Sequence, residues 1–164
     1  MSSISYLAVL KNLVAMSALV LLTACSGLKT YHEATNKNLN ITTKTDSSSV
    51  FSSVDTMLHI YSLNNNCEVS YAGTVKLTSP VMKVGIPDNK TNYLEFEFAS
   101  SGMFYSHSSS ISADTILKPK PGFSYDIEVS YIDDLYNVVI HEKNSNKSKP
   151  RELDLQPLAS CIKR

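Results

Sequence analysis

The sequence predicts an all-β protein built as an antiparallel β-sandwich, and three observations support this prediction. Short runs rich in β-branched and aromatic residues, separated by turn residues, begin at Asp55. No window within residues 55–142 shows a sustained helical period of 3.6 residues. About seven to nine short strands over about 110 residues are typical of two packed sheets, and they leave little room for helices.

The clearest element is an antiparallel hairpin near the C-terminus. Apolar and polar residues alternate strictly over residues 123–131, which is the period of a half-buried strand. Asp133 and Asp134 supply a tight turn, and residues 135–142 form the returning strand. The other expected strands cover residues 56–63, 67–77, 81–86, 92–99, 103–117 and 152–155. Gly73 marks a bulge or a turn inside the second of these.

Residues 25–54 differ from the rest of the chain in composition. Serine, threonine, asparagine and lysine dominate this segment, and apolar residues are few. Such a segment buries too little apolar surface to offset the entropy lost on ordering. We therefore expect a flexible linker over residues 25–54, which leaves residues 55–164 as one β-sandwich domain.

The N-terminus has the features of an export signal. An apolar stretch of about a dozen residues follows Lys11, which is too short to span a bilayer as a helix. The motif Leu22-Thr23-Ala24-Cys25 resembles the bacterial lipobox. That resemblance implies that residues 1–24 are removed as a signal peptide and that Cys25 carries diacylglycerol and a further acyl chain such as palmitate. Ser26 is similar to the residue found in lipoproteins sorted to the Gram-negative outer membrane. The alternative is an ordinary secretory peptide with an incidental cysteine.

Charge and cysteine content restrict the function further. The whole chain has 15 basic and 15 acidic residues, and removal of residues 1–24 takes away only Lys11, which leaves 14 against 15. This balance argues against nucleic acid as a partner. Cys67 and Cys161 are then the only free thiols of an exported chain, and we expect them to form a disulfide. A buried, unpaired Cys67 is the alternative.

The pattern of histidines and acids predicts no metal site and no cofactor. The four histidines are scattered, and neither an H-x-x-x-H nor a C-x-x-C spacing occurs. Adjacent carboxylates at the hairpin tip are better explained by turn formation than by acid-base catalysis. The histidines are His32, His59, His107 and His141.

The sequence also contains no recognisable catalytic motif. Serines surround His107 at positions 106, 108, 109 and 110, but the G-x-S-x-G turn that strains a nucleophilic serine is absent. We therefore expect a polar loop there and no catalytic residue, so the protein is predicted not to be an enzyme.

One short motif suggests an inhibitor. Ser101, Gly102 and Tyr105 match S-G-x-x-Y, which is similar to the loop that membrane-bound lipoprotein inhibitors of C-type lysozyme insert into the enzyme cleft. In that family a tryptophan-containing segment follows the loop, whereas this chain has no tryptophan. A common Ser-Gly turn is the simpler explanation of the match, and inhibition is kept as the alternative.

Tyrosine is the most frequent aromatic residue, and most of the tyrosines fall inside the expected domain. Several tyrosines on one outer face would form an amphipathic patch for a protein or glycan partner. The simpler interpretation is that tyrosine fits half-buried strand positions. The tyrosines concerned are Tyr61, Tyr71, Tyr93, Tyr105, Tyr125, Tyr131 and Tyr136.

The HIY of residues 59–61 and the segment LKPKPGFSYDIEVSY of residues 117–131 resemble small all-β lipoproteins of Gram-negative bacteria, whose function is unassigned. That resemblance implies a sandwich of the immunoglobulin or transthyretin type. We therefore expect a lipid-anchored outer-membrane protein, facing the periplasm or the cell surface, that serves as a non-enzymatic binding or structural accessory with a protein partner in the envelope. The alternatives are an inhibitor of lysozyme or another hydrolase and an assembly lipoprotein of a secretion or surface machine.

Overall fold

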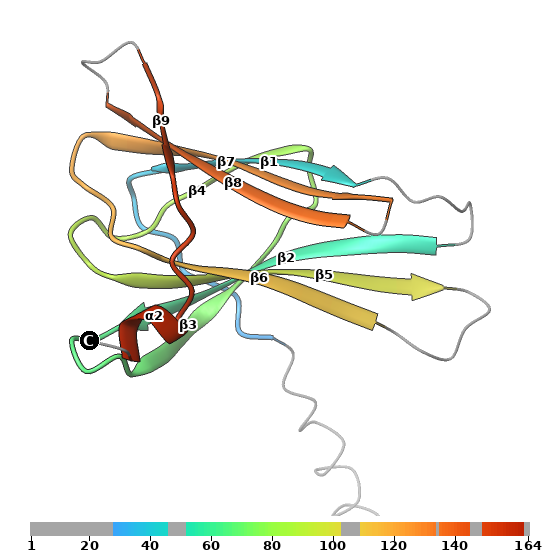
Figure 1. Cartoon of the computed structure of the whole chain (residues 1–164), viewed down its shortest axis with the longest axis horizontal. Coiled ribbons are helices and arrows are strands. Elements are labelled where there is room, and N and C mark those ends of the chain that lie inside the picture. The colour runs from blue at the N-terminus through green and yellow to red at the C-terminus, as the bar shows by residue number, and fades with distance from the viewer. Residues whose placement is uncertain (1–27, 46–51, 103–108, 134, 145–148, 163–164) are drawn as a thin grey trace, which may run out of the picture.

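Two sheets pack face to face, so the predicted β-sandwich is confirmed (Figure 1). The structure is a computed structural model that describes residues 28–45, 52–102, 109–133, 135–144 and 149–162. The strands are β1 (Leu39–Thr45), β2 (Ser52–Leu63), β3 (Val69–Lys76), β4 (Val81–Val84), β5 (Asn92–Gly102), β6 (Ser109–Leu117), β7 (Phe123–Ile132), β8 (Leu135–Asn144) and β9 (Arg151–Leu153), and the short helix α2 (Ala159–Ile162) follows them. One sheet has the order β4-β1-β7-β8-β9, and the other has the order β3-β2-β5-β6.

Alternate strand positions fill the core between the sheets. In β7, Tyr125, Ile127 and Val129 are almost fully buried, as the alternating pattern predicts. β8 pairs antiparallel with the whole of β7, which confirms the hairpin. Asp133 in the turn has a φ of 49°, a left-handed conformation that aspartate tolerates better than most residues. The largest fully buried side chains of the other strands are Leu39, Ile41, Leu58, Ile60, Leu94, Phe96, Phe98 and Ile140.

β3 contains the bulge that Gly73 predicts. Ile60 of β2 lies opposite Gly73, whereas the next residue, Tyr61, lies opposite Tyr71, so Ala72 has no partner on β2. Because successive side chains of a strand point to opposite faces, one extra residue reverses the faces beyond it. The bulge therefore places Tyr71 on the outer face of the sheet beside Tyr61.

Residues 28–45 belong to the domain, so the predicted linker over residues 25–54 is wrong in this part, and so is the predicted boundary at residue 55. β1 is an inner strand of its sheet, antiparallel to β4 on one side and parallel to β7 on the other. Leu39 and Ile41 are fully buried, and the residues between and after them are polar. Only one face of β1 meets the core, so two apolar residues are enough to bury this strand.

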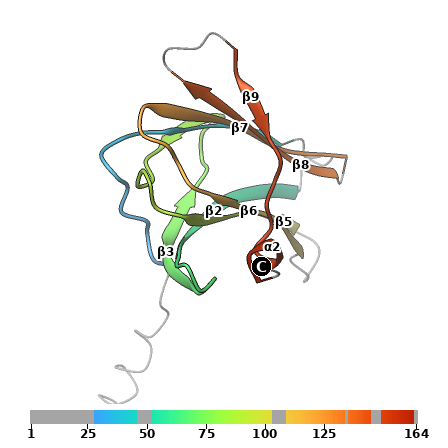
Figure 2. The same cartoon turned by 60° about the vertical axis from the view of Figure 1, so that its left-hand side comes forward.

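Before β1 the chain runs along the edge of β3 and then crosses to the other sheet (Figure 2). The Thr74 N–H donates to the Lys29 carbonyl at 2.8 Å, and the Tyr31 N–H donates to the Thr74 carbonyl at 3.0 Å. A Cβ atom on Gly73 would lie 2.6 Å from the Tyr31 Cα, and one on Gly85 would lie 2.2 Å from the Ala34 carbonyl oxygen. Two glycines therefore let this crossing segment, residues 28–38, lie directly against the strands.

Asn38 completes the attachment of the crossing segment. Its side-chain amide donates to the Ile86 carbonyl at 2.9 Å, and its side-chain oxygen accepts from the Ile86 N–H at 3.0 Å. Its own carbonyl accepts from the Tyr125 N–H at 2.8 Å. Because this side chain is buried, removing its hydrogen bonds would leave backbone groups of Ile86 without partners in the core.

Replacement of Gly73 by alanine tests the close approach of the crossing segment. Gly73 has a φ of 147°, and backbone atoms of Thr30 and Tyr31 occupy the space where a Cβ would stand. We expect Gly73→Ala to cost at least about 2 kcal/mol and to lower the Tm by roughly 5–10 °C in thermal denaturation followed by circular dichroism.

Gly122→Ala is the matched control for this experiment. Gly122 also has a positive φ, 76°, but no atom lies within 4 Å of a Cβ built there. Gly122→Ala should therefore lower the free energy of unfolding only by the conformational strain of a positive φ, about 1 kcal/mol. Equal losses of stability in the two variants would contradict the packing of residues 30 and 31 against β3.

Candidate functional site

A row of tyrosines crosses the outer face of the β3-β2-β5-β6 sheet. Tyr71 of β3, Tyr61 of β2 and Tyr93 of β5 lie opposite one another in register, and we call them the tyrosine row. The ring centroid of Tyr61 lies 5.3 Å from that of Tyr71 and 5.2 Å from that of Tyr93. The plane of the Tyr61 ring is tilted by 52° to the Tyr71 ring and by 47° to the Tyr93 ring. Tyr71 is 36% exposed, and the other two are half-buried. Several tyrosines therefore share one outer face.

Three carboxylates lie on the same face. They belong to Glu95, Glu97 and Asp114, and we call them the acidic cluster. Glu95 of β5 is directly opposite Asp114 of β6, and Glu97 is two residues further along β5. The hydroxyl of Tyr61 donates to Glu95 at 3.3 Å. Like charges placed directly opposite each other in a sheet are unfavourable unless a partner compensates them.

Burial raises the pKa of two tyrosines of the row. It raises the pKa of Tyr61, with further contributions from Glu95, and it raises the pKa of Tyr93 to about 12, with further contributions from the charges of Asp114 and Glu95. At neutral pH these hydroxyls are therefore donors toward the carboxylates. The face combines neutral aromatic rings with negative charge.

A chain of short hydrogen bonds runs beside the row. The Tyr71 hydroxyl lies 2.5 Å from the Thr74 hydroxyl, which lies 2.6 Å from Nδ1 of His59, and Nε2 of His59 lies 2.7 Å from Glu97. Both backbone groups of Thr74 point to the crossing segment on the other side of β3. His59 and Thr74 are thus a pair without mutual backbone hydrogen bonds, and such pairs bring their side chains closest together.

Carboxylate, imidazole and hydroxyl occur here in the order found in a hydrolase triad. No sequence motif reveals this arrangement, because Thr74, His59 and Glu97 lie on three different strands. The Thr74 hydroxyl, however, is shared with Tyr71, the residue is 7% exposed, and its N–H donates to the Lys29 carbonyl rather than to a bound oxyanion. This series of hydrogen bonds is better suited to holding Tyr71 in place than to attacking a substrate.

A pocket of about 520 Å³ adjoins the tyrosine row at the disulfide end of the sheet. Ile116, the cross-strand neighbour of Tyr93, lines it, and so does Leu63, two residues beyond Tyr61. The other lining residues are mainly polar: Asn64, Asn65, Asn66, Cys67, Thr91, Gln156, Ser160 and Cys161.

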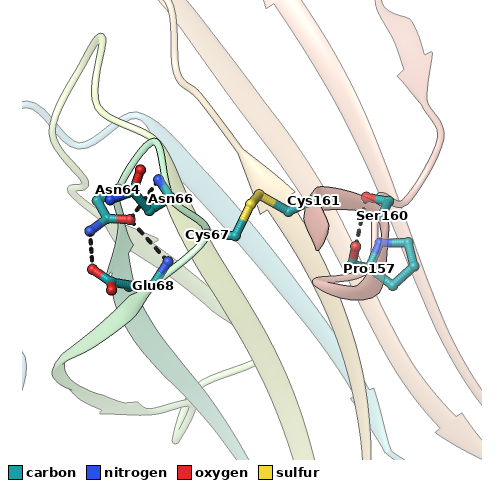
Figure 3. The surroundings of a disulfide bond; sticks show 7 residues. All are labelled: Asn64, Asn66, Cys67, Glu68, Pro157, Ser160 and Cys161. Carbon is teal, nitrogen blue, oxygen red and sulfur yellow. Dashed lines mark hydrogen bonds between the residues drawn. A yellow bond between two sulfur atoms is a disulfide. The ribbon is translucent and has the colours of Figure 1, made fainter. Parts of the chain in front are cut away.

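The predicted disulfide between Cys67 and Cys161 is confirmed (Figure 3). Both cysteines line this pocket. The Cα atoms of the two cysteines are 5.9 Å apart. The side-chain oxygen of Asn64 accepts from the N–H groups of Asn66 and Glu68, each at 2.9 Å, which holds the turn that presents Cys67. Cys67 itself has a φ of 63°.

The C-terminal strap, residues 156–161, reaches the disulfide from the edge of β6. The Gln156 N–H donates to the Thr115 hydroxyl at 3.0 Å, and the Leu158 N–H donates to the Asp114 carboxylate at 3.0 Å. α2 then carries Cys161 to the β2–β3 turn (Figure 1). The strap therefore ties an outer strand of the sheet to the opposite side.

The predicted inhibitor loop and lipid site fall mainly outside the described residues. Ser101 and Gly102 end β5, where their backbones pair with β2. Tyr105 and Cys25 lie outside the described residues, so the inhibitor loop and the lipidation stay predictions. In the described parts of the chain, no helix is long and apolar enough to cross a membrane.

The structure does not bring the histidines together. His59 is buried and hydrogen-bonded to Thr74 and Glu97. His32 is exposed, and His141 lies 3.9 Å from Glu152. His107 lies outside the described residues. Where the structure describes the chain, no group of three histidine, cysteine or acidic side chains is arranged to hold a metal ion.

Glu142 forms a second cluster of charges, at the end of β8. Its side chain is 8% exposed, and it lies 2.9 Å from Lys120 and 2.9 Å from Arg151 and accepts from the Tyr125 hydroxyl at 3.2 Å. Burial alone raises the pKa of Glu142, but the hydrogen bonds and charges of Lys120 and Arg151 outweigh it, so the pKa is lowered. This carboxylate joins the β6–β7 connection to β9, and we assign it a structural role.

Comparison with known proteins gives no match: no protein-family model, no curated protein and no solved structure matches this chain.

Replacement of both cysteines tests the strap. The disulfide closes a loop of 94 residues, for which chain-entropy models give nearly 5 kcal/mol and measured losses are about 2–5 kcal/mol. We expect a Cys67→Ser, Cys161→Ser double variant to unfold at a much lower urea concentration than the parent, in the presence of oxidant. Cys25→Ser is the control and should leave the midpoint unchanged. Equal midpoints for all three proteins would show that the disulfide does not stabilise the domain.

Glu142→Gln tests the buried carboxylate. Because its pKa is lowered in the folded state, its contribution to stability is present above the ordinary value of 4.5 and is lost as the pH falls through the lowered pKa. We expect a loss of about 1–3 kcal/mol at pH 7 and a flatter dependence of stability on pH below 5. Glu152→Gln, whose side chain is 72% exposed, is the control and should cost less than about 0.5 kcal/mol. A loss in Glu142→Gln that is identical at pH 7 and at pH 3 would contradict this assignment.

Proposed function

We propose that the protein is a lipid-anchored lipoprotein of the bacterial outer membrane that acts as a non-enzymatic binding accessory, and that the tyrosine row with the acidic cluster is its binding surface. The observation that carries the binding role is the alignment of three tyrosines beside three carboxylates on one sheet face. Aromatic rings with polar tips and few conformational freedoms are enriched at recognition surfaces. The lipobox at Cys25 supports the anchoring.

The crossing segment makes the tether short. Residue 29 is already hydrogen-bonded to β3, and Cys25 stands three residues before Leu28. Three residues of extended chain span at most about 11 Å, so the lipidated residue would stay close to the edge of β3. The domain would then lie against the bilayer, with the tyrosine row on the sheet that is nearest to the anchor.

The chemistry of the face favours binding over catalysis. Burial raises the pKa of Tyr61 and Tyr93, so both hydroxyls stay protonated at neutral pH. The Thr74 hydroxyl and His59 are already engaged in hydrogen bonds within the sheet. Groups fixed in this way present a preorganised surface, which lowers the entropy lost on binding. A partner in the envelope would thus be held near the membrane without being modified.

Cys25→Ser tests the anchoring. In a Gram-negative host supplied with radiolabelled palmitate, we expect the parent protein to carry label and to sediment with outer membranes. The variant should lose the label and the sedimentation. A variant that still sediments with membranes would contradict a lipid anchor at this position.

Substitutions at Ser26 are the matched controls for the anchoring. Ser26→Ala should behave as the parent, because it keeps a small, non-acidic residue after the cysteine. By the same sorting pattern, Ser26→Asp should move the labelled protein to the inner membrane. Outer-membrane retention of the Ser26→Asp variant would contradict the proposed location.

A further inference from the structure

We infer that the tyrosine row and the acidic cluster together bind a basic segment of a partner protein, with lysine or arginine side chains lying over the rings and among the carboxylates. This inference rests on the proposed binding function and names the ligand class of the same face.

Two of the three carboxylates, Glu95 and Asp114, have no charged partner among the described side chains of this face, whereas Glu97 lies 2.7 Å from Nε2 of His59. Lys76 is the one lysine among the described strands of this face, and it pairs with Asp55 at 3.2 Å. Met57 of β2 lies between Lys76 on β3 and Glu97 on β5. The acidic cluster therefore has no lysine or arginine of its own strands beside it. A ligand with positive charge would relieve the repulsion between opposed carboxylates.

Glu95 and Asp114 are held by donors that leave their charge in place. Tyr61 donates its hydroxyl to Glu95, and the Leu158 N–H donates to Asp114. These neutral donors orient the carboxylates without neutralising them. Oriented, charged acceptors at a half-exposed surface are suited to ammonium and guanidinium groups, which form the stronger, charge-assisted hydrogen bonds.

The rings add a second attraction of the same specificity. A lysine or arginine cation within about 6 Å of a tyrosine ring is attracted by the negative face of the ring, and its methylene stem packs on the same ring. Neighbouring ring centroids of the row are just over 5 Å apart, so one basic side chain can contact two rings. Rings and carboxylates thus favour the same kind of ligand.

The geometry fits a glycan less well. A sugar stacks on a flat, open ring face, but the rings of the row are tilted by 52° and 47° and are packed against each other. Neutral sugars would also leave Glu95 and Asp114 without a countercharge. The neutral polar pocket beside Ile116 and Leu63 can take the side chain that precedes or follows the basic residue in an extended peptide.

Peptide titration tests the inference on the full mature protein, held in nanodiscs of uncharged phosphatidylcholine. The probes are fluorescent heptapeptides in which alanine alternates with lysine, arginine or glutamate, and the glycan probe is an N-acetylglucosamine tetramer. By fluorescence anisotropy we expect the basic peptides to bind, the glutamate peptide not to bind, and added salt to weaken binding. A Glu95→Gln, Asp114→Asn double variant should bind the basic peptides at least tenfold more weakly.

The control variant removes two charges elsewhere. Glu128→Gln with Asp133→Asn acts on β7 and its hairpin turn in the other sheet, and it should change the affinity less than twofold. Glu95→Lys, which reverses one charge, should abolish binding of the basic peptides. The double variant should be at least as stable as the parent in thermal denaturation, because it removes a pair of like charges, so weaker binding cannot be ascribed to unfolding.

Two results would overturn the inference. The first is equal affinity of the parent and the Glu95→Gln, Asp114→Asn double variant for the basic peptides. The second is binding of the glycan but of none of the peptides, with the glycan affinity weakened by Tyr61→Ala. The second result would leave the proposed binding face intact and change only its ligand. If none of the probes binds and the face tolerates every substitution while Cys25 still anchors the protein, the binding role of the face fails as well.

Discussion

The path of residues 28–38 is the constraint on which the rest of the structure depends. The segment lies against Gly73 at the edge of one sheet and against Gly85 near the other, and it then delivers β1 between β4 and β7. Without β1, β4 would have no partner strand in its sheet. The segment therefore joins the two sheets through backbone contacts that only glycine permits, and it sets the order of the five-stranded sheet.

The same region determines the surface that we propose as functional. Gly73 stands at the bulge that brings Tyr71 to the outer face beside Tyr61, and Thr74, the next residue, links Tyr71 to His59. A segment that starts so soon after Cys25 would also leave the proposed anchor with a short tether in place of a long linker. The fold, the proposed binding face and the proposed position at the membrane thus depend on the same few residues at one edge of β3.

The sequence predicted most of the strands, because period-two alternation is a local property that survives in any half-buried sheet. It also predicted the disulfide, from two thiols and the compartment alone. It did not predict β1, because this strand has a parallel partner, β7, far along the chain and needs only Leu39 and Ile41 to fill its inner face. The tyrosine row and the link between Thr74, His59 and Glu97 depend on cross-strand register, which a one-residue bulge changes. From residue types alone, half-buried strand positions are the simpler interpretation of the tyrosines and a patch is the alternative; only the register shows which tyrosines share a face.

Native-state hydrogen exchange on the mature protein is the most direct test of this account. The amides of Tyr31 and Ala34, which donate to Thr74 and Gly85, and those of β1 should exchange as slowly as the Tyr125 amide in the core. Fast exchange throughout residues 28–45, at the rate of an unstructured chain, would contradict the docked crossing segment and with it the short tether.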